Sequence, residues 1–150
     1  MPDTLIVLRH AKSDWTGNVP DFDRPLAGRG RRDAPAAGRW LADNAGAIDL
    51  VVCSPAKRAR QTWKRVAAEL PSQPEVRFEP RLYDEGVGAL LDVLLDVPAG
   101  PKTVLFVGHN PDLSMLVERL SGGECELRTS SIAVVDLATK TVRATATPRG

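Results

Sequence analysis

Short runs of consecutive apolar residues alternate along this chain with stretches in which apolar positions recur every three or four residues. The apolar runs are LIVL at 5–8, LVVC at 50–53 and VLFV at 104–107, and all three are unbroken. Unbroken runs rich in β-branched residues are typical of parallel strands that helices cover on both faces. We therefore expect an α/β fold in which these runs are the central parallel strands.

Two stretches between these runs have helical spacing, and we expect both to be covering helices. They comprise residues 33–43 and 56–70. The first of them contains Pro35, which would break a helix from an interior position but is tolerated in the first turn. The helix is therefore expected to begin near Asp33.

Two further helix starts are predicted from a polar residue followed by proline. Ser54-Pro55 and Asn110-Pro111 each place a capping side chain before a proline at the first helical position. At the C-terminal end, IAVVDL at 132–137 and TVRATAT at 141–147 flank residues 138–140, which predicts a hairpin or edge pair that closes the sheet.

No repeat, low-complexity tract or linker interrupts the chain, and 150 residues fit one domain. We expect residues 1–150 to form a single-domain, three-layer α/β/α sandwich with a mostly parallel central sheet. The 20 basic and 19 acidic residues leave a net charge of +1, which gives no electrostatic reason to expect nucleic acid or a membrane as a partner.

The cysteines and the N-terminus indicate a reduced, cytoplasmic protein. Cys53 and Cys125 form no CxxC pair and are too few for a disulfide scaffold or a thiolate metal site. The N-terminal residues contain no basic segment, and the run 5–8 is far too short for a signal sequence or a membrane span.

Titratable and cationic residues follow the apolar runs directly. Arg9 and His10 come after the first run, and Gly108 and His109 come after the third. The helix expected after the second run carries Lys57, Arg58 and Arg60 in its first turns. Ligands of open α/β sheets bind beyond the carboxyl ends of the parallel strands, so both histidines of this protein and several cations are expected at one edge of the sheet.

Such a group of side chains fits a phosphoryl ligand. Guanidinium groups match the geometry of phosphate oxygens, and helix N-termini add N–H donors. A neutral histidine can attack phosphorus and carry the phosphoryl group covalently, while cations stabilise the charge on its oxygens. Each residue alone also fits a structural or solvated role, but that interpretation gives no reason for their common position.

Three segments in this order resemble the histidine phosphatase superfamily, which has the phosphoglycerate-mutase-like fold. They are LRHAKS, SPAKRARQT and GHNP. The short length, the opening LRHAKSDW and the segment DFDRPLAGRG at 21–30 are similar to the compact SixA-type phosphohistidine phosphatases. Ala11 stands where much of the superfamily has glycine, as in many short members.

The resemblance implies a role for four residues. His10 would be the nucleophile that accepts the phosphoryl group, and Arg9 beside it would bind the phosphoryl oxygens. Arg58 would be the second phosphate-binding arginine, and His109 would donate a hydrogen bond to the phosphoryl group in the transition state. The resemblance implies no metal or organic cofactor.

Many members of the superfamily also have an acidic residue that protonates the leaving group. The corresponding stretch here is PRLYDEGVG at 80–88, in which Asp84 and Glu85 are the candidates. An acidic pair before a helix is equally explained by the helix dipole. A phosphohistidine substrate would need such an acid less than a phosphate ester, because imidazole, with a pKa of ~6.5, leaves readily once it is protonated.

The sequence therefore leaves three possibilities for the substrate and the activity. A metal-independent phosphatase acting on a phosphohistidine protein is the main expectation, and a broad-specificity phosphatase of small phosphorylated metabolites is the alternative. A catalytically weak module that binds phosphoproteins is a further alternative. Loop 11–27 is too short for the lid of a mutase, so hydrolysis is favoured over transfer.

Several loop residues near the expected site fit either substrate contact or ordinary packing. They are Lys12, Ser13, Asp14, Trp15 and Arg24, with the segment 129–131 before the fifth strand.

Overall fold

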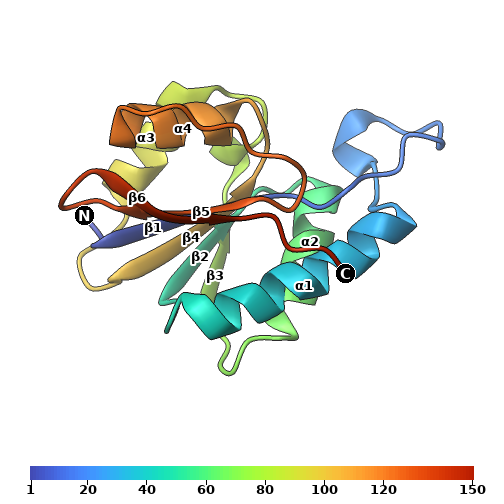
Figure 1. Ribbon diagram of the computed structural model, residues 1–150. Coiled ribbons are helices and arrows are strands. Elements are labelled where there is room, and N and C mark those ends of the chain that lie inside the picture. The colour runs from blue at the N-terminus through green and yellow to red at the C-terminus, as the bar shows by residue number, and fades with distance from the viewer.

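One six-stranded sheet runs through the centre of the computed structural model, which describes all 150 residues (Figure 1). The elements in chain order are β1 (Thr4–Arg9), α1 (Gly28–Asn44), β2 (Leu50–Cys53), α2 (Lys57–Ala67), β3 (Glu75–Phe78), α3 (Val87–Asp96), β4 (Thr103–Gly108), α4 (Asp112–Ser121), β5 (Ile132–Asp136) and β6 (Thr141–Ala146). Short 3₁₀ turns occupy Asp21–Asp23 and Pro80–Leu82.

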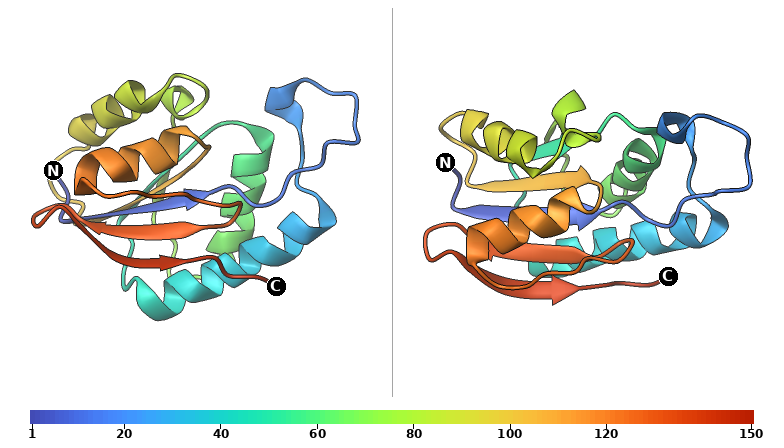
Figure 2. Two further views of the ribbon diagram at one scale, coloured as in Figure 1. Left: turned by 45° about the horizontal axis from the view of Figure 1, so that its top comes forward. Right: turned by 90° about the horizontal axis from the view of Figure 1, so that it is seen from above.

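The strand order is β3-β2-β4-β1-β5-β6, so the three predicted runs lie side by side as β2, β4 and β1. The pairs among β3, β2, β4 and β1 are parallel, whereas β5 is antiparallel to both β1 and β6. The predicted C-terminal hairpin is thus confirmed, with β6 at one edge of the sheet (Figure 2).

Helices cover both faces of the sheet, with α1 and α2 on one face and α3 and α4 on the other (Figure 1). Leu5 and Val7 of β1 pack into the core beneath α3 and α4, and Ile6 and Leu8 pack into the core beneath α1 and α2. All four side chains are fully buried, which explains why the run is unbroken. The predicted single-domain α/β/α sandwich is confirmed.

Helix α1 corrects the expected start near Asp33, because it begins at Gly28 and contains Pro35 in its interior. Gly30 allows the extra turns to lie directly against loop 11–27, since a Cβ at this position would fall 2.1 Å from the carbonyl oxygen of Lys12. The helix thus starts before Pro35 where it packs against a distant segment, and the local spacing of apolar residues does not reveal this contact.

The predicted caps of helices α2 and α4 are also shifted. Helix α2 begins at Lys57 after Ala56, and Ser54 does not cap it. Helix α4 begins at Asp112, and its cap residue is Pro111. The Asn110 side chain still accepts a hydrogen bond from the backbone N–H of Ser114 at 3.2 Å, so it satisfies a donor in the first turn from one residue further out.

Strand β3 was not predicted from the sequence. It is a four-residue edge strand, EVRF, whose side chains are mostly exposed, so it carries no apolar run.

Helix α3 covers the opposite face from α2 and buries Val87, Leu90, Val93 and Leu94. None of the helices combines the length and the hydrophobicity that a membrane span requires.

Candidate active site

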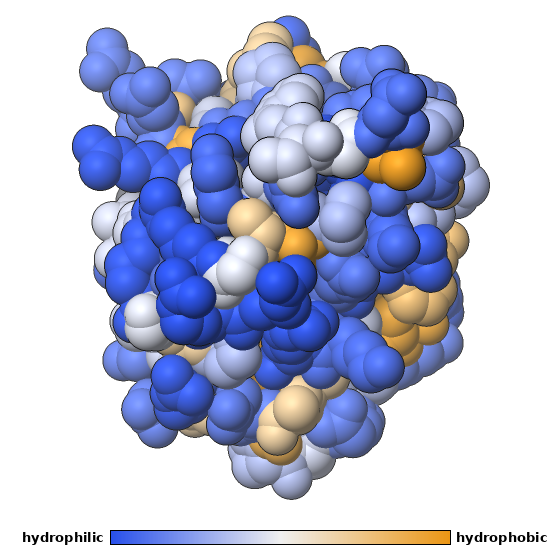
Figure 3. Space-filling view, turned by 90° about the vertical axis from the view of Figure 1, so that its right-hand side faces the viewer, coloured by the Kyte–Doolittle hydropathy of each residue, from blue (hydrophilic) through white to orange (hydrophobic).

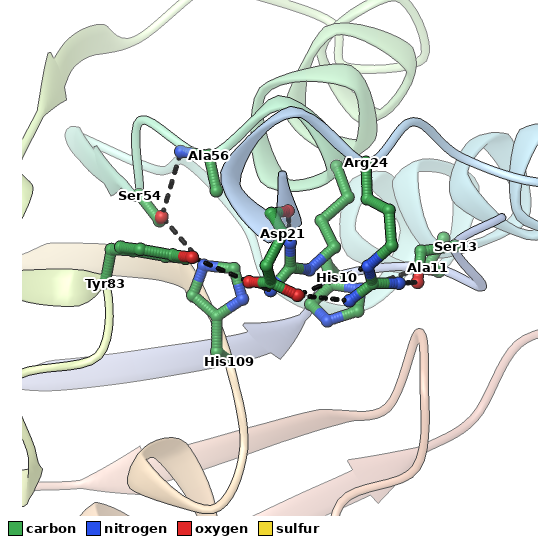
Figure 4. Close-up of polar contacts among 10 residues, drawn as sticks. His10, Ala11, Ser13, Asp21, Arg24, Ser54, Ala56, Tyr83 and His109 are labelled. Carbon is green, nitrogen blue, oxygen red and sulfur yellow. Dashed lines mark hydrogen bonds and ion pairs between the residues drawn. The ribbon is translucent and has the colours of Figure 1, made fainter. Parts of the chain in front are cut away.

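The two histidines meet at the carboxyl edge of the sheet because β1 and β4 are neighbouring parallel strands. Arg9 is in register with Gly108, so the next residues, His10 and His109, leave the sheet side by side. Their rings lie 5.2 Å apart between centroids and are tilted by 54° (Figure 4). Both side chains are buried. The structure therefore confirms that these strand ends bring both histidines together.

Helix α2 brings Arg58 to the same place from the end of β2. Together with Arg9 and the two histidines, Arg58 lines a cavity of about 250 Å³. The remaining lining residues are Lys12, Ser13, Trp15, Arg24, Asn110 and Thr129. The surrounding face is mainly hydrophilic, with hydrophobic residues only in small separate patches (Figure 3). Four cationic side chains and no carboxylate line this cavity.

The buried side-chain nitrogen and oxygen atoms that lack a hydrogen-bond partner concentrate here. Throughout the chain they number four: Nε of Arg9, Nε of Arg58, Nδ1 of His109 and Oγ of Ser130. The first three belong to residues that line the cavity. Leaving a buried donor unsatisfied costs about 1–3 kcal/mol, so their concentration in one cavity is typical of a site that binds an anion.

The ring of His10 is oriented by the chain that follows it. Nδ1 lies 2.7 Å from the carbonyl oxygen of Ala11, which can only accept, so Nδ1 carries the proton and Nε2 has a free lone pair. Burial lowers the pKa of His10 to about 3, with a contribution from His109. At neutral pH His10 is thus an uncharged imidazole with an available nucleophilic nitrogen.

His109 has the complementary arrangement, which Ser54 determines. Nε2 of His109 lies 2.8 Å from Oγ of Ser54, and the same oxygen accepts from the backbone N–H of Ala56 at 3.2 Å. Ser54 is fully buried, and its hydroxyl proton is satisfied when it is donated to Nε2. The proton of neutral His109 is then on Nδ1, the atom without a partner. Burial lowers the pKa of His109 to about 4.

Asp21 joins three parts of the site, a role that was not predicted from the sequence. Its Oδ2 accepts from the hydroxyl of Tyr83 at 2.6 Å and from Nη2 of Arg58 at 3.1 Å, and its Oδ1 accepts from Nη2 of Arg24 at 3.0 Å (Figure 4). The hydrogen bond from Tyr83, together with those from the arginines, holds the pKa of Asp21 well below its usual value. The segment DFDR contained the signal, an acidic residue three positions before Arg24.

Of the loop residues that the sequence offered as candidates, Lys12, Ser13, Trp15 and Arg24 line the cavity. Nη1 of Arg24 donates to Oγ of Ser13, and the Arg24 guanidinium lies 3.5 Å from the centroid of the Trp15 ring. Asp14 does not line the cavity, and its carboxylate accepts hydrogen bonds from the backbone N–H and the hydroxyl of Thr16.

The two acid candidates lie away from this arrangement. Asp84 and Glu85 are exposed, do not line the cavity, and take part in no side-chain hydrogen bond or ion pair. The residue before them, Tyr83, faces the site instead, with its ring centroid 5.4 Å from that of His109. Lys57 and Arg60 are exposed on the outer side of α2, and only Arg58 of this basic group enters the cavity.

No group of three or more His, Cys, Asp or Glu side chains is placed to hold a metal ion. The guanidinium groups of Arg9 and Arg58 and the imidazole of His109 can bind a tetrahedral oxyanion, which the neutral His10 can attack at its centre.

Comparison with known proteins agrees with this chemistry. The pattern of the histidine phosphatase superfamily (branch 1) matches residues 5–93. The chain is 37% identical over 142 residues to an uncharacterised protein of Mycobacterium tuberculosis (strain H37Rv), covering 87% of each chain. It is 32% identical over 139 residues to the phosphohistidine phosphatase SixA of Escherichia coli (strain K12), covering 89% of this chain and 84% of SixA.

The fold is similar to a solved structure of the protein histidine phosphatase SixA in complex with tungstate. The TM-score is 0.82 at 28% identity, with 97% of both chains covered. The phosphoglycerate-mutase-like architecture expected from the motifs is therefore confirmed.

Proposed function

Because this chain belongs to the histidine phosphatase superfamily, as the matched pattern and relatives establish, we propose that it hydrolyses phosphohistidine on proteins through a phosphorylated intermediate on His10. The enzyme is a phosphatase. The observation that carries the proposed mechanism is the hydrogen bond from Nδ1 of His10 to Ala11, which leaves Nε2 unprotonated in a cavity that Arg9, Arg58 and His109 also line.

The first step transfers the phosphoryl group to the enzyme. Nε2 of His10 forms a bond to phosphorus while the phosphorus–nitrogen bond of the substrate breaks, and its electron pair remains on the leaving imidazole. The side chains of Arg9, Arg58 and His109, which line the cavity, donate to the phosphoryl oxygens. In the second step water attacks phosphorus, His10 is released and inorganic phosphate leaves.

The proposal that the substrate is phosphohistidine depends on the positions and the ionisation of the carboxylates near the cavity. No carboxylate lines the cavity, and Asp21, which is bonded to two of the lining arginines, is held ionised by its four donor contacts. An ionised carboxylate cannot protonate an alkoxide leaving group. An imidazole that is already protonated on its other ring nitrogen needs no such acid, so a phosphoramidate is the better substrate.

We place the substrate in the cytoplasm and on a protein. The relative from Escherichia coli is a phosphohistidine phosphatase, and both cysteines of this chain are free, as in a reducing compartment. The cavity volume of about 250 Å³ is compatible with a phosphorylated side chain that projects from another protein.

The test compares three substrates at equal concentration: a phosphohistidine peptide, the same peptide with phosphoserine, and p-nitrophenyl phosphate. We expect kcat/KM for the phosphohistidine peptide to exceed that for phosphoserine at least a hundredfold, because general acid catalysis supplies about 10²–10⁴-fold where it exists. Comparable turnover of the two peptides would support a broad-specificity phosphatase instead, and binding of phosphate without turnover would support a recognition module.

A further inference from the structure

A shallow concave surface, separate from the catalytic cavity, lies between α2 and β3. This groove, called here the α2 groove, has a volume of about 560 Å³, and its lining includes Arg60, Trp63, Lys64, Ala67 and Phe78. None of its residues lines the catalytic cavity. The proposed catalytic chemistry therefore does not explain the groove.

The groove is positively charged. Helix α2 carries five basic residues and no acidic residue. Of these, Arg58 is buried in the catalytic cavity, whereas Lys57, Arg60 and Lys64 are exposed and form no ion pair. Arg60 is held in place by a hydrogen bond from its Nε to the carbonyl oxygen of Pro55 at 2.7 Å, so its charge has a defined position at the wall of the groove.

An apolar surface lies beside these charges. Phe78 is 53% exposed at the end of β3, although the other phenylalanines are better covered. Trp63, which is almost fully buried, and the small side chain of Ala67 line the same groove on α2. A groove that combines an exposed aromatic ring with unpaired cations fits a segment that carries both carboxylates and an apolar side chain.

The groove and the catalytic cavity share one helix and one edge of the sheet. Arg58 and Lys64 are six residues apart on α2, which corresponds to about 9 Å along the helix axis. Strand β3 is parallel to β2, so Phe78 at its carboxyl end lies at the same edge of the sheet as the catalytic histidines. A chain with its phosphorylated side chain in the cavity would reach the groove within about five or six extended residues.

We propose that the α2 groove docks an acidic segment with an apolar side chain next to the phosphohistidine of the protein substrate. This inference rests on the proposed phosphohistidine function and names the part of the substrate that the cavity does not recognise. A membrane surface fits less well, because only two cations, Arg60 and Lys64, line the groove, fewer than the clusters of basic residues that bind anionic lipids.

The test uses two phosphohistidine peptides that differ only in a six-residue extension, placed in turn on either side of the phosphorylated residue. One extension is acidic and apolar, Asp-Leu-Glu-Asp-Leu-Glu, and the other replaces the acids with Ser and Gln. We expect wild-type kcat/KM to be about tenfold higher for the acidic peptide at low salt, falling toward equality at 0.5 M salt. Turnover of p-nitrophenyl phosphate is measured in parallel.

Two variants test whether the preference for the acidic peptide depends on the α2 groove. Arg60→Glu/Lys64→Glu reverses two groove charges, and Phe78→Ala removes the aromatic ring. We expect the first to abolish the preference for the acidic peptide and the second to reduce it two- to fivefold, with p-nitrophenyl phosphate turnover unchanged in both. Lys102→Glu/Arg119→Glu is the matched control, because it reverses two exposed, unpaired cations away from the groove and should keep the preference.

An equal rate for both peptides in the wild type, or an unchanged preference in Arg60→Glu/Lys64→Glu, would overturn the docking proposal. Sedimentation of the wild type with vesicles containing 30% phosphatidylserine, lost in the same variant, would also overturn it and identify a membrane surface. Absence of turnover of every phosphohistidine peptide would instead refute the proposed function itself, so the two failures are distinguishable.

Discussion

Nε2 of His109 lies 2.8 Å from the hydroxyl oxygen of Ser54, a residue that the sequence marked only as a helix cap. The same oxygen accepts a hydrogen bond from Ala56, so the hydroxyl proton is directed to the imidazole. Ser54 thereby determines which nitrogen of His109 carries the proton that the cavity needs.

We expect Ser54→Ala to lower kcat about 5- to 30-fold with a smaller change in KM, because a lost neutral hydrogen bond corresponds to about 1–2 kcal/mol. Ser54→Thr, which keeps the hydroxyl, should recover most of the rate. Ser121→Ala, a hydroxyl on α4 away from the cavity, is the control and should behave as the wild type. Equal losses in the Ala and Thr variants would show that the hydroxyl does not set the tautomer.

Gly30 is the point where α1 touches loop 11–27. A Cβ there would lie 2.1 Å from the backbone oxygen of Lys12, so Gly30→Ala must displace the loop. We expect it to lower the free energy of unfolding by about 1–3 kcal/mol and to raise KM, since Lys12 and Ser13 line the cavity. Gly88→Ala on α3 meets no atom within 4 Å and should stabilise the protein by about 0.5 kcal/mol or more in urea unfolding. Equal effects of the two substitutions would contradict this packing.

Asp84 and Glu85 are exposed and outside the cavity. We expect Asp84→Ala and Glu85→Ala each to change kcat/KM for a phosphohistidine peptide less than twofold. Steady-state kinetics of both variants on the peptide and on a phosphoserine peptide will check this. A tenfold or larger loss in either variant would identify a general acid that moves into the site when substrate binds.

The low pKa values of the two histidines predict how stability depends on pH. Both are lowered in the folded protein, to about 3 for His10 and about 4 for His109, so the unfolded chain binds more protons below pH 6.5. The contribution of the two neutral histidines to the free energy of unfolding is therefore fully present above pH 7. It decreases as the pH falls, by about 2 kcal/mol per histidine at pH 5. Urea unfolding at pH 8 and pH 5 measures this.

In His10→Gln the difference in unfolding free energy between pH 8 and pH 5 should shrink by about 2 kcal/mol. The carboxylate of Asp21 is held ionised to still lower pH and contributes little in this window. A pH dependence identical in wild type and variant would mean that His10 is not desolvated.

The sequence predicted the parts of the site that depend on local order along a strand. A buried strand must end where its apolar run ends, so the sequence alone was enough to place Arg9, His10 and His109 at one edge of the sheet. The assignment of the three runs to central parallel strands followed from the same burial, and the structure places them side by side in the sheet.

The remaining features depend on contacts between distant segments. Asp21 meets Tyr83 across 62 positions of sequence, and Ser54 meets His109 across 55. No local pattern encodes these pairs, and the exposed edge strand β3 has no apolar periodicity to reveal it. The early start of α1 likewise depends on the contact of Gly30 with Lys12, which only tertiary packing creates.

His10 is the residue on which the proposed mechanism depends most, because it carries the phosphoryl group. Rapid-quench labelling with a ³²P-phosphohistidine peptide, comparing wild type with His10→Ala, tests this directly. We predict acid-labile, alkali-stable label on the wild type within the first turnover, located on the peptide containing His10, and none on the variant. Label of equal amount on His10→Ala, or rapid turnover of the wild type with no label at any quench time, would contradict the proposed mechanism.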